Sequence, residues 1–179
     1  HSVRMGVPRG KALGPDDMNG FLVHLLLGET PAYDVEALTL PGEMSALASP
    51  FAVDEGWTAG KGLSAAERFL KNTTEVTSHL SAWRYRLPLL FHRALTDDGS
   101  VRETYYGPDL RVLINFGPGD YEEDDLVLPP QGFLVKYPFF LAFYAKRMHG
   151  LDYERPAFFT VRSLEGKMYL RAKRVRLYH

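Results

Sequence analysis

The chain contains no cysteine among its 179 residues. Disulfide frameworks, thiol nucleophiles and cysteine-based zinc sites are therefore excluded, because each of them needs a cysteine sulfur. The sequence also lacks a run of the roughly 18 apolar residues that a membrane-spanning helix needs, and no signal-peptide pattern opens it. We therefore predict that a membrane is not among its partners.

An excess of charge of one sign is missing as well. Lys and Arg total 21 against 22 for Asp and Glu, which leaves a net charge of −1. A chain that binds nucleic acid through its overall field is usually strongly basic. We therefore predict no nucleic-acid partner.

Signatures of metal and cofactor sites are also absent. The six histidines are scattered, and no pair has the spacing of a zinc-binding helix. The acidic run Asp120–Asp125 lacks the central glycine and the terminal glutamate of a calcium loop. We predict no metal and no cofactor, and we interpret the run as a solvated turn between strands. A basic tail would face it in cross-strand pairs, formed by Arg171, Lys173, Arg174 and Arg176.

The first half combines glycine, proline and short apolar clusters. Phe21–Leu27 is apolar apart from His24, which fits a buried strand or a buried helical turn, and Gly28 ends it in either case. From Glu29 to Gly62 the pattern allows at most a short helix around Met44–Ala48. Ser64 and Glu67 then form a capping box, and the apolar stripe that follows predicts a helix over 64–82.

In the second half the pattern changes to short strands separated by glycine and proline. The turn Asp97-Asp98-Gly99 predicts a hairpin between the first two strands. The predicted strands are Leu89–Leu95, Val101–Tyr106, Leu110–Phe116, Gly132–Tyr137, Phe139–Met148, Ala157–Arg162 and Met168–Tyr178. Strands at this spacing are typical of an antiparallel sandwich. We therefore predict an α+β chain, with a mainly helical and irregular segment at 1–83 followed by a β-sandwich at 84–179.

The irregular segment holds the side chains that best fit a binding site. If Phe21–Leu27 is a parallel strand, Glu29 lies just beyond its carboxyl end, where barrel enzymes place polar groups. Trp57 lies beside Asp54 and Glu55, so a ring face and hydrogen-bond acceptors are close together, as sugar binding requires. We take Glu29, Tyr33, Asp54 and Trp57 as candidate substrate-binding residues. The alternative is that Trp57 anchors a loop and Glu29 caps a turn.

Five strings in order carry a resemblance to a known family. They are His24–Glu29 with Pro31, Arg68–Thr73 with Glu75 and Val76, Val112–Gly117, Leu128–Phe133, and Phe158–Lys167. Through them the chain resembles the C-terminal portion of bacterial glycoside-hydrolase-like proteins, in which a (β/α)8 barrel precedes a β-sandwich. The family looks related to the wider clan that contains α-N-acetylgalactosaminidases.

The resemblance implies an accessory role for this chain. A barrel needs about 200 residues or more, so residues 1–83 would be only its end, and the start at His1 rather than Met fits a piece of a longer protein. The catalytic carboxylates would lie on absent strands, so the parent would be a glycosidase and this segment alone inactive. Its partner would be the barrel domain of the parent chain, with possible contact to glycan, in the bacterial cytoplasm or exported with that parent.

A different class of function stays open. The second half could be an independent, non-catalytic carbohydrate-binding or interaction module. Exposed aromatic residues would then form its binding platform, drawn from Tyr105, Tyr106, Tyr121, Tyr137, Phe139, Phe140, Tyr144 and Tyr153. Since side chains alternate between the faces of a strand, about half of them must instead be core.

Overall fold

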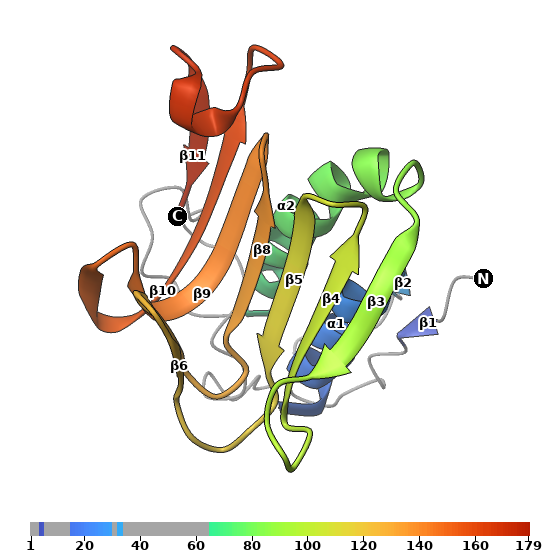
Figure 1. The fold of residues 1–179 in the computed structure, drawn as a ribbon, viewed down its shortest axis with the longest axis vertical. Coiled ribbons are helices and arrows are strands. Elements are labelled where there is room, and N and C mark those ends of the chain that lie inside the picture. Colours follow the sequence, from blue (N-terminus) through green and yellow to red (C-terminus); the bar gives the residue numbers. More distant parts are fainter. Residues whose placement is uncertain (1–3, 6–14, 30–31, 34–64) are drawn as a thin grey trace. The chain divides into compact units, whose positions relative to one another are not determined.

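The structure is a computed structural model that describes residues 4–5, 15–29, 32–33 and 65–179 (Figure 1). The chain divides into two compact units, His1–Ser81 and Ala82–His179, and this boundary falls inside the second helix. Within these residues the fold is α+β, with two helices and a large antiparallel, sandwich-like sheet, as the sequence predicts. The assignment of residues 1–83 to the end of a barrel stays a prediction.

Helix α1 (Pro15–Leu27) settles the alternative that the apolar run left open, because Phe21–Leu27 is helical. Proline suits the first position of a helix, where its missing N–H would have no partner within the helix. The helix ends at Gly28, whose φ is 77°, and the amide of Glu29 then donates to the carbonyl oxygen of His24 at 2.8 Å. This left-handed glycine cap is a common way to end a helix.

Helix α2 (Ala65–Arg84) confirms the helix predicted over 64–82, while Ser64 of the capping box lies outside the described residues. The predicted stripe is buried at Phe69, Val76 and Leu80. The Phe69 ring meets Phe21 of α1 edge to face, with centroids 6.5 Å apart. The first unit also contains a short parallel pair, β1 (Arg4–Met5) and β2 (Ala32–Tyr33), whereas Met44–Ala48 lies outside the described residues.

The second unit contains one antiparallel sheet (Figure 1). Its strands are β3 (Leu89–Ala94), β4 (Val101–Tyr106), β5 (Leu110–Asn115), β6 (Tyr121–Glu123), β7 (Leu126–Leu128), β8 (Phe133–Tyr137), β9 (Phe140–Met148), β10 (Leu151–Ser163) and β11 (Val175–Tyr178). The main order is β11-β10-β9-β8-β5-β4-β3, and the β6–β7 hairpin joins it through β9. The first five predicted strands are confirmed within one residue at each end.

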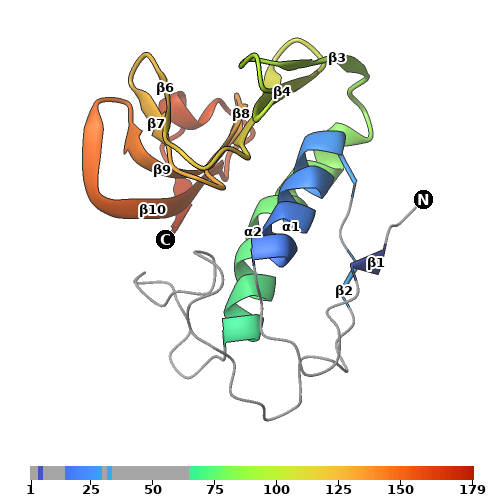
Figure 2. The same ribbon diagram turned by 90° about the horizontal axis from the view of Figure 1, so that it is seen from below.

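The core of this unit lies between the sheet and the β6–β7 hairpin. Leu126 and Leu128 of β7 share one buried cluster with Leu113, Leu134 and Phe143 of the neighbouring strands. In Figure 2, β6, β7, β9 and β10 curl round the same side of the unit. A single hydrogen-bonded sheet therefore produces the layered core of a sandwich by folding a hairpin over one of its own faces.

Three expectations for this unit are wrong. Met168–Tyr178 is not one strand, because a 3-10 turn, η3 (Tyr169–Arg171), interrupts it and only Val175–Tyr178 pairs with β10. Strand β10 begins at Leu151 rather than Ala157, because His149 and Gly150 form a tight hairpin turn with φ values of 51° and 75°.

The acidic run is the third correction, because Tyr121–Glu123 within it is a strand rather than a turn. The basic tail is not its partner either. Glu123 binds Arg111, and Asp120 binds Lys146 at 2.7 Å. The pairing differs because β6 turns back onto β7, and through β7 onto β9, whereas the tail follows β10.

Candidate functional site

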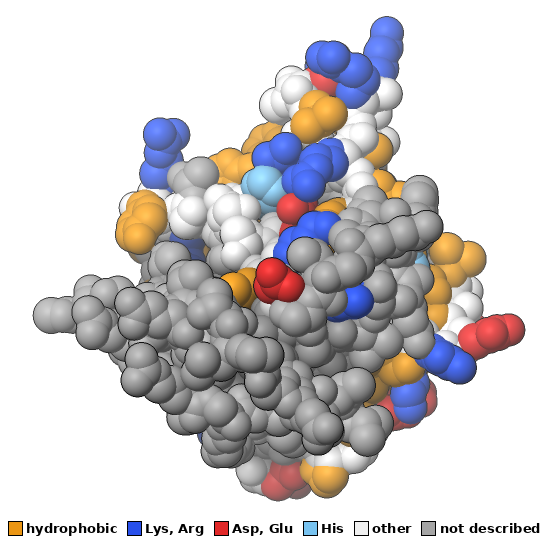
Figure 3. Space-filling view, turned by 180° about the vertical axis from the view of Figure 1, so that it is seen from behind, with side chains coloured by type: hydrophobic (Ala, Val, Ile, Leu, Met, Phe, Trp, Pro, Cys, Tyr) orange, Lys and Arg blue, Asp and Glu red, His pale blue; other side chains and the backbone are white. Residues whose placement is uncertain are grey.

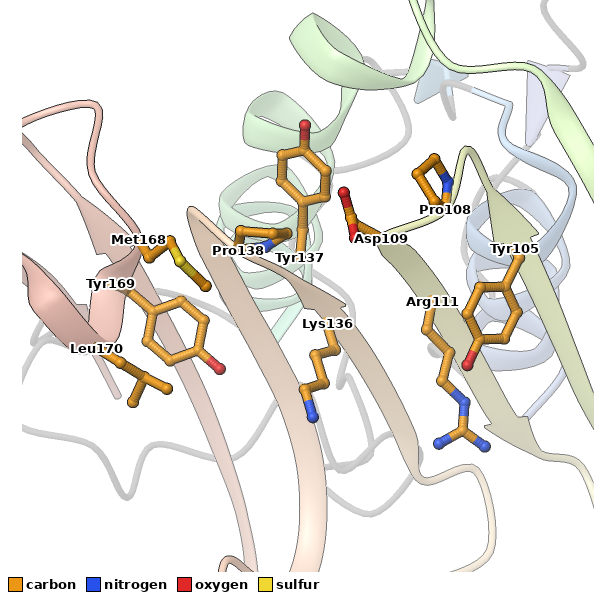
Figure 4. A pocket seen from close by; sticks show the side chains of 10 residues that line it. All are labelled: Tyr105, Pro108, Asp109, Arg111, Lys136, Tyr137, Pro138, Met168, Tyr169 and Leu170. Carbon is orange, nitrogen blue, oxygen red and sulfur yellow. The ribbon is translucent and has the colours of Figure 1, made fainter.

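A pocket opens at one end of the sheet in the second unit, and we call it the tyrosine pocket. Its volume is about 340 Å³. Its lining comes from β4, β5, β8, η3 and the turns beside them: Tyr105, Pro108, Asp109, Arg111, Lys136, Tyr137, Pro138, Met168, Tyr169 and Leu170. Figure 4 shows these side chains from close by.

The register of the sheet explains why three of these residues meet. Tyr105 lies directly opposite Arg111, and Arg111 lies directly opposite Lys136. Residues opposite each other in antiparallel strands point to the same face. A row of one aromatic and two basic side chains therefore crosses β4, β5 and β8 and forms the floor of the pocket.

The wall facing this row is provided by η3. The Tyr169 amide donates to the carbonyl oxygen of Pro138 at 2.8 Å, which ties η3 to the turn between β8 and β9. Tyr169 is half-buried, and burial raises the pKa of its hydroxyl. In Figure 4 the Tyr169 ring lies across the pocket from Tyr105, with Lys136 between them. Tyr137 is backed by Trp83, with ring centroids 5.0 Å apart.

A charged network holds the floor rigid. Arg111 donates from Nε to Glu103 at 2.8 Å, and from both terminal nitrogens to Glu123 at 2.7 and 2.8 Å. Glu103 is only 1% exposed and also accepts from Arg93 at 2.6 Å. Buried carboxylates are tolerated when they are paired in this way.

The network also shifts the titration of its members. Burial alone would lower the pKa of Arg111, but the hydrogen bonds and charges of Glu123 and Glu103 outweigh it and raise this pKa. The hydrogen bonds from Arg111 lower the pKa of Glu123. Burial, with the nearby charge of Glu123, raises the pKa of Tyr121. Arg111, Glu123 and Tyr121 therefore keep their ordinary charge at neutral pH, and the Arg111 guanidinium is occupied by its two carboxylate partners.

Two charged groups of the lining have no ion-pair partner among the described residues. These are the Lys136 ammonium and the Asp109 carboxylate, both on exposed residues. Figure 4 shows them at opposite ends of the lining. The pocket thus offers ring faces, a donor at one end and an acceptor at the other, a combination that can hold a polar ring-shaped ligand by stacking and hydrogen bonds.

The other end of β5 and β8 is built differently, and we call it the Asn115 junction (residues 115–119 and 128–132). The buried Asn115 amide nitrogen lies 2.7 Å from the carbonyl oxygen of Gly119, and 3.0 Å from those of Leu128 and Pro129. Its side-chain oxygen accepts from the amide of Gly117 at 2.9 Å. A Cβ on Gly132 would lie 2.6 to 2.9 Å from Pro129 atoms. Two strings of the resemblance, Val112–Gly117 and Leu128–Phe133, therefore serve to join two strands.

Of the four sequence-predicted site residues, the structure describes Glu29 and Tyr33. Glu29 follows α1 and its carboxylate lies 3.0 Å from Nδ1 of the buried His24, so it closes the end of the helix. The prediction that Phe21–Leu27 is a parallel strand with Glu29 at its carboxyl end is wrong, because this segment belongs to helix α1. Tyr33 lies in β2, paired through its backbone with Met5, while Asp54 and Trp57 lie outside the described residues. Their role in substrate binding stays a prediction.

Sequence reasoning found part of the pocket and missed the rest. Tyr105 and Tyr137 belong to the aromatic residues proposed for a binding platform, whereas Tyr169, Lys136 and Asp109 were not singled out. The register that aligns Lys136 with Arg111 could have identified the row, but it depends on pairing β5 with β8 across the β6–β7 hairpin. The remainder of the aromatic set includes core residues such as Phe140 and Tyr144.

Comparison of the chain with protein-family models, curated proteins and solved structures finds no match. Within the described ranges, no group of three or more His, Asp or Glu side chains is arranged to hold a metal ion. Neither α1 nor α2, the helices of the described part, is long and apolar enough to cross a membrane.

Proposed function

We propose that the second unit, Ala82–His179, is a non-catalytic accessory module that binds carbohydrate in the tyrosine pocket, and that the chain belongs to a larger carbohydrate-active enzyme. The observation that carries this proposal is a concave site of about 340 Å³ in which the rings of Tyr105 and Tyr169 lie on opposite sides, with Lys136 between them. Pockets of about this size hold small ligands.

The chemistry of the lining supports a sugar ring in particular. Aromatic faces pack against the C–H faces of a sugar, and the Lys136 ammonium and Asp109 carboxylate can donate to and accept from its hydroxyls. Met168 and Leu170 add apolar surface beside Tyr169. The floor is preorganised because Glu103 and Glu123 hold Arg111, so little order is lost when a ligand binds.

The same features favour binding over chemistry for this unit. The most deeply buried carboxylate, Glu103, is held between two arginines, an arrangement typical of a structural ion pair rather than a free acid or base. Glycoside hydrolysis needs two positioned carboxylates facing the substrate. In this proposal the catalytic pair and the barrel belong to the rest of the parent enzyme.

Calorimetry with the full 179-residue chain tests the proposal. A panel of neutral and acidic oligosaccharides is titrated into the wild type, Tyr169→Ala and Tyr153→Ala. Tyr153 is the matched control, because it is also a partly buried tyrosine of the same unit and does not line the pocket. We expect binding by the wild type, a loss of about tenfold in affinity for Tyr169→Ala, and little change for Tyr153→Ala. Binding of no glycan, or equal losses in both variants, would overturn the proposal.

A further inference from the structure

Basic side chains crowd the segment that carries η3 and β11. Between Lys167 and Arg176 the chain has Lys167, Arg171, Lys173, Arg174 and Arg176 and no acidic residue, and all five are exposed. We call this segment the basic segment. Figure 3 shows Lys and Arg side chains gathered on the end of the unit that is drawn at the top in Figure 1, where η3 and the start of β11 lie.

Several cations of the basic segment have no ion pair within the described residues, in contrast to Lys146 and Arg147 of β9. Elsewhere, Lys146 binds Asp120 at 2.7 Å and Arg147 binds Asp152 at 2.6 Å. In the basic segment, Arg174 has a 3.4 Å contact with Glu165. Among the described residues, Lys167, Arg171 and Lys173 have no ion-pair partner. An anion placed here would therefore find cations that are not already neutralised.

The basic segment is continuous with the tyrosine pocket. Met168, Tyr169 and Leu170 line the pocket, and Lys167 and Arg171 directly flank them in the chain. Lys136 brings one more ammonium into the lining itself. Asp109, the lining's free carboxylate, is drawn at the other end from the Lys136 ammonium in Figure 4. The positive charge thus includes Lys136 in the middle of the lining and continues into the residues that flank η3.

We propose that the glycan of this pocket is an acidic polysaccharide, with one sugar ring between Tyr105 and Tyr169 and its carboxylate or sulfate groups on Lys136 and the basic segment. This inference rests on the proposed function and specifies its ligand. Charge-assisted hydrogen bonds to carboxylate and sulfate oxygens are stronger than bonds between neutral groups. A row of such groups along a polymer would use several of these cations at once.

The geometry favours an acidic glycan over a nucleic acid, the other common polyanion. The chain's net charge is −1, so the positive field is local rather than global. The pocket is a concave site with an acceptor, Asp109, for hydroxyl groups, which a sugar ring carries in abundance. Single-stranded nucleic acid usually follows a long basic groove with several stacked bases.

The experiment compares ligands of matched length on the full chain. Calorimetric titrations use a tetrasaccharide of galacturonic acid, a sulfated chondroitin tetrasaccharide, a neutral cello-tetraose and a single-stranded oligonucleotide, at low and at moderate salt. The variants are Lys136→Gln, Lys173→Gln and, as the matched control, Lys146→Gln, which removes the same charge from a lysine already paired with Asp120.

We expect an acidic tetrasaccharide to bind at least about tenfold more tightly than cello-tetraose, with the preference falling as salt rises. Lys136→Gln and Lys173→Gln should each weaken the acidic ligand by about fivefold and leave cello-tetraose unchanged, while Lys146→Gln changes neither by more than about twofold. The galacturonate and chondroitin arms tell carboxylate from sulfate recognition, and a clear preference for either supports the inference.

The results that would contradict this inference differ from those that would contradict the proposed function. Equal affinity for neutral and acidic sugars, still dependent on Tyr169, would overturn the inference and leave the proposed function standing. Absence of binding to every sugar would overturn both. Tighter binding of the oligonucleotide than of either acidic sugar, with loss in Lys173→Gln, would overturn the inference in favour of a nucleic-acid ligand.

Discussion

Strands β5 and β8 lie side by side, and their two ends have opposite characters. At the Asn115 junction every polar group of the Asn115 side chain has a buried backbone partner, and Gly132 leaves no room for a side chain. At the tyrosine pocket, which lies at the opposite end of the two strands, Lys136 and Asp109 are exposed and have no ion-pair partner among the described residues. One end is closed by its own backbone, and the other is open to a ligand.

The difference separates the residues that define the fold from those that suit binding. The strings Val112–Gly117 and Leu128–Phe133, two of the five on which the predicted resemblance rests, meet at the closed end. Their asparagine, prolines and glycines fit what a buried strand junction demands. Similarity to another protein in these two strings would therefore indicate a similar sheet rather than a similar ligand. In our proposal, ligand preference depends on the other end, which these two strings do not cover.

The closed end predicts the largest loss of stability. Asn115→Ala removes a side-chain donor to the carbonyl oxygens of Gly119 and Leu128 and the acceptor of the Gly117 amide, and unsatisfied buried groups cost about 1 to 3 kcal/mol each. We expect urea denaturation to show a loss of at least about 3 kcal/mol in the free energy of unfolding. Thr74→Ala on α2 should change it by less than about 1 kcal/mol, since Thr74 is exposed and alanine is favoured in helices. Similar effects in the two variants would contradict the account.

The glycines of the junction predict the next effect. The Cβ of Gly132→Ala would meet Pro129 at 2.6 to 2.9 Å, and two of the three contacting atoms are backbone atoms, which cannot move without shifting the chain. We expect a loss of about 1 to 3 kcal/mol, which lowers the melting temperature by at least about 4 °C. In Gly119→Ala the new Cβ would meet nothing within 4 Å, so the melting temperature should stay within about 2 °C of the wild type. Equal shifts in melting temperature would show that the junction is not tightly packed.

The network beneath the pocket predicts a smaller, pH-dependent effect. The pKa of Glu123 is lowered in the folded state by hydrogen bonds from Arg111. Its contribution to stability is therefore complete above the usual glutamate pKa and is lost as the pH falls through the folded value. The difference in melting temperature between the wild type and Glu123→Gln should be larger at pH 7 than at pH 3. A difference that grows at pH 3 would contradict the assignment.

The open end predicts the smallest change in stability. Lys136 is exposed and makes no ion pair with a described residue, so Lys136→Gln should alter the free energy of unfolding by no more than about 0.5 kcal/mol. Chemical denaturation of the purified variant measures this directly. A loss comparable to that of Asn115→Ala would mean that the pocket end is part of the structural core and would remove the contrast between the two ends.

Much of the fold could be predicted from local patterns. The apolar stripe of α2, the turn at Asp97–Gly99 and the alternation of β4 and β5 are local signals, and the structure confirms the elements they predict. Phe21–Leu27 could not be decided because a short apolar run suits a buried helix and a buried strand equally. The structure shows a helix, with Pro15 at its start and Gly28 at its end.

The missed features depend on contacts between distant segments. The acidic residues of β6 predict a solvated turn when the segment is considered alone. The segment forms a strand in which Glu123 is stabilised by Arg111, a residue of another strand, and the local sequence does not contain this contact. The segment Met168–Tyr178 has strand-forming residues, but only its last four find a partner in β10. The pocket depends on the pairing of β5 with β8, which are distant in the sequence, so the local sequence around Lys136 or Tyr169 does not predict it.

Mapping the bound glycan by NMR tests the central claim most directly. The full chain, labelled with ¹⁵N, is titrated with the oligosaccharide that binds most tightly, and the shifts of backbone amides are followed. We predict that the perturbed amides cluster at residues 105–111, 136–137 and 168–171, whereas those of the Asn115 junction stay in place. Perturbations centred on the junction, or spread evenly over the sheet, would contradict the division between a closed structural end and an open binding end.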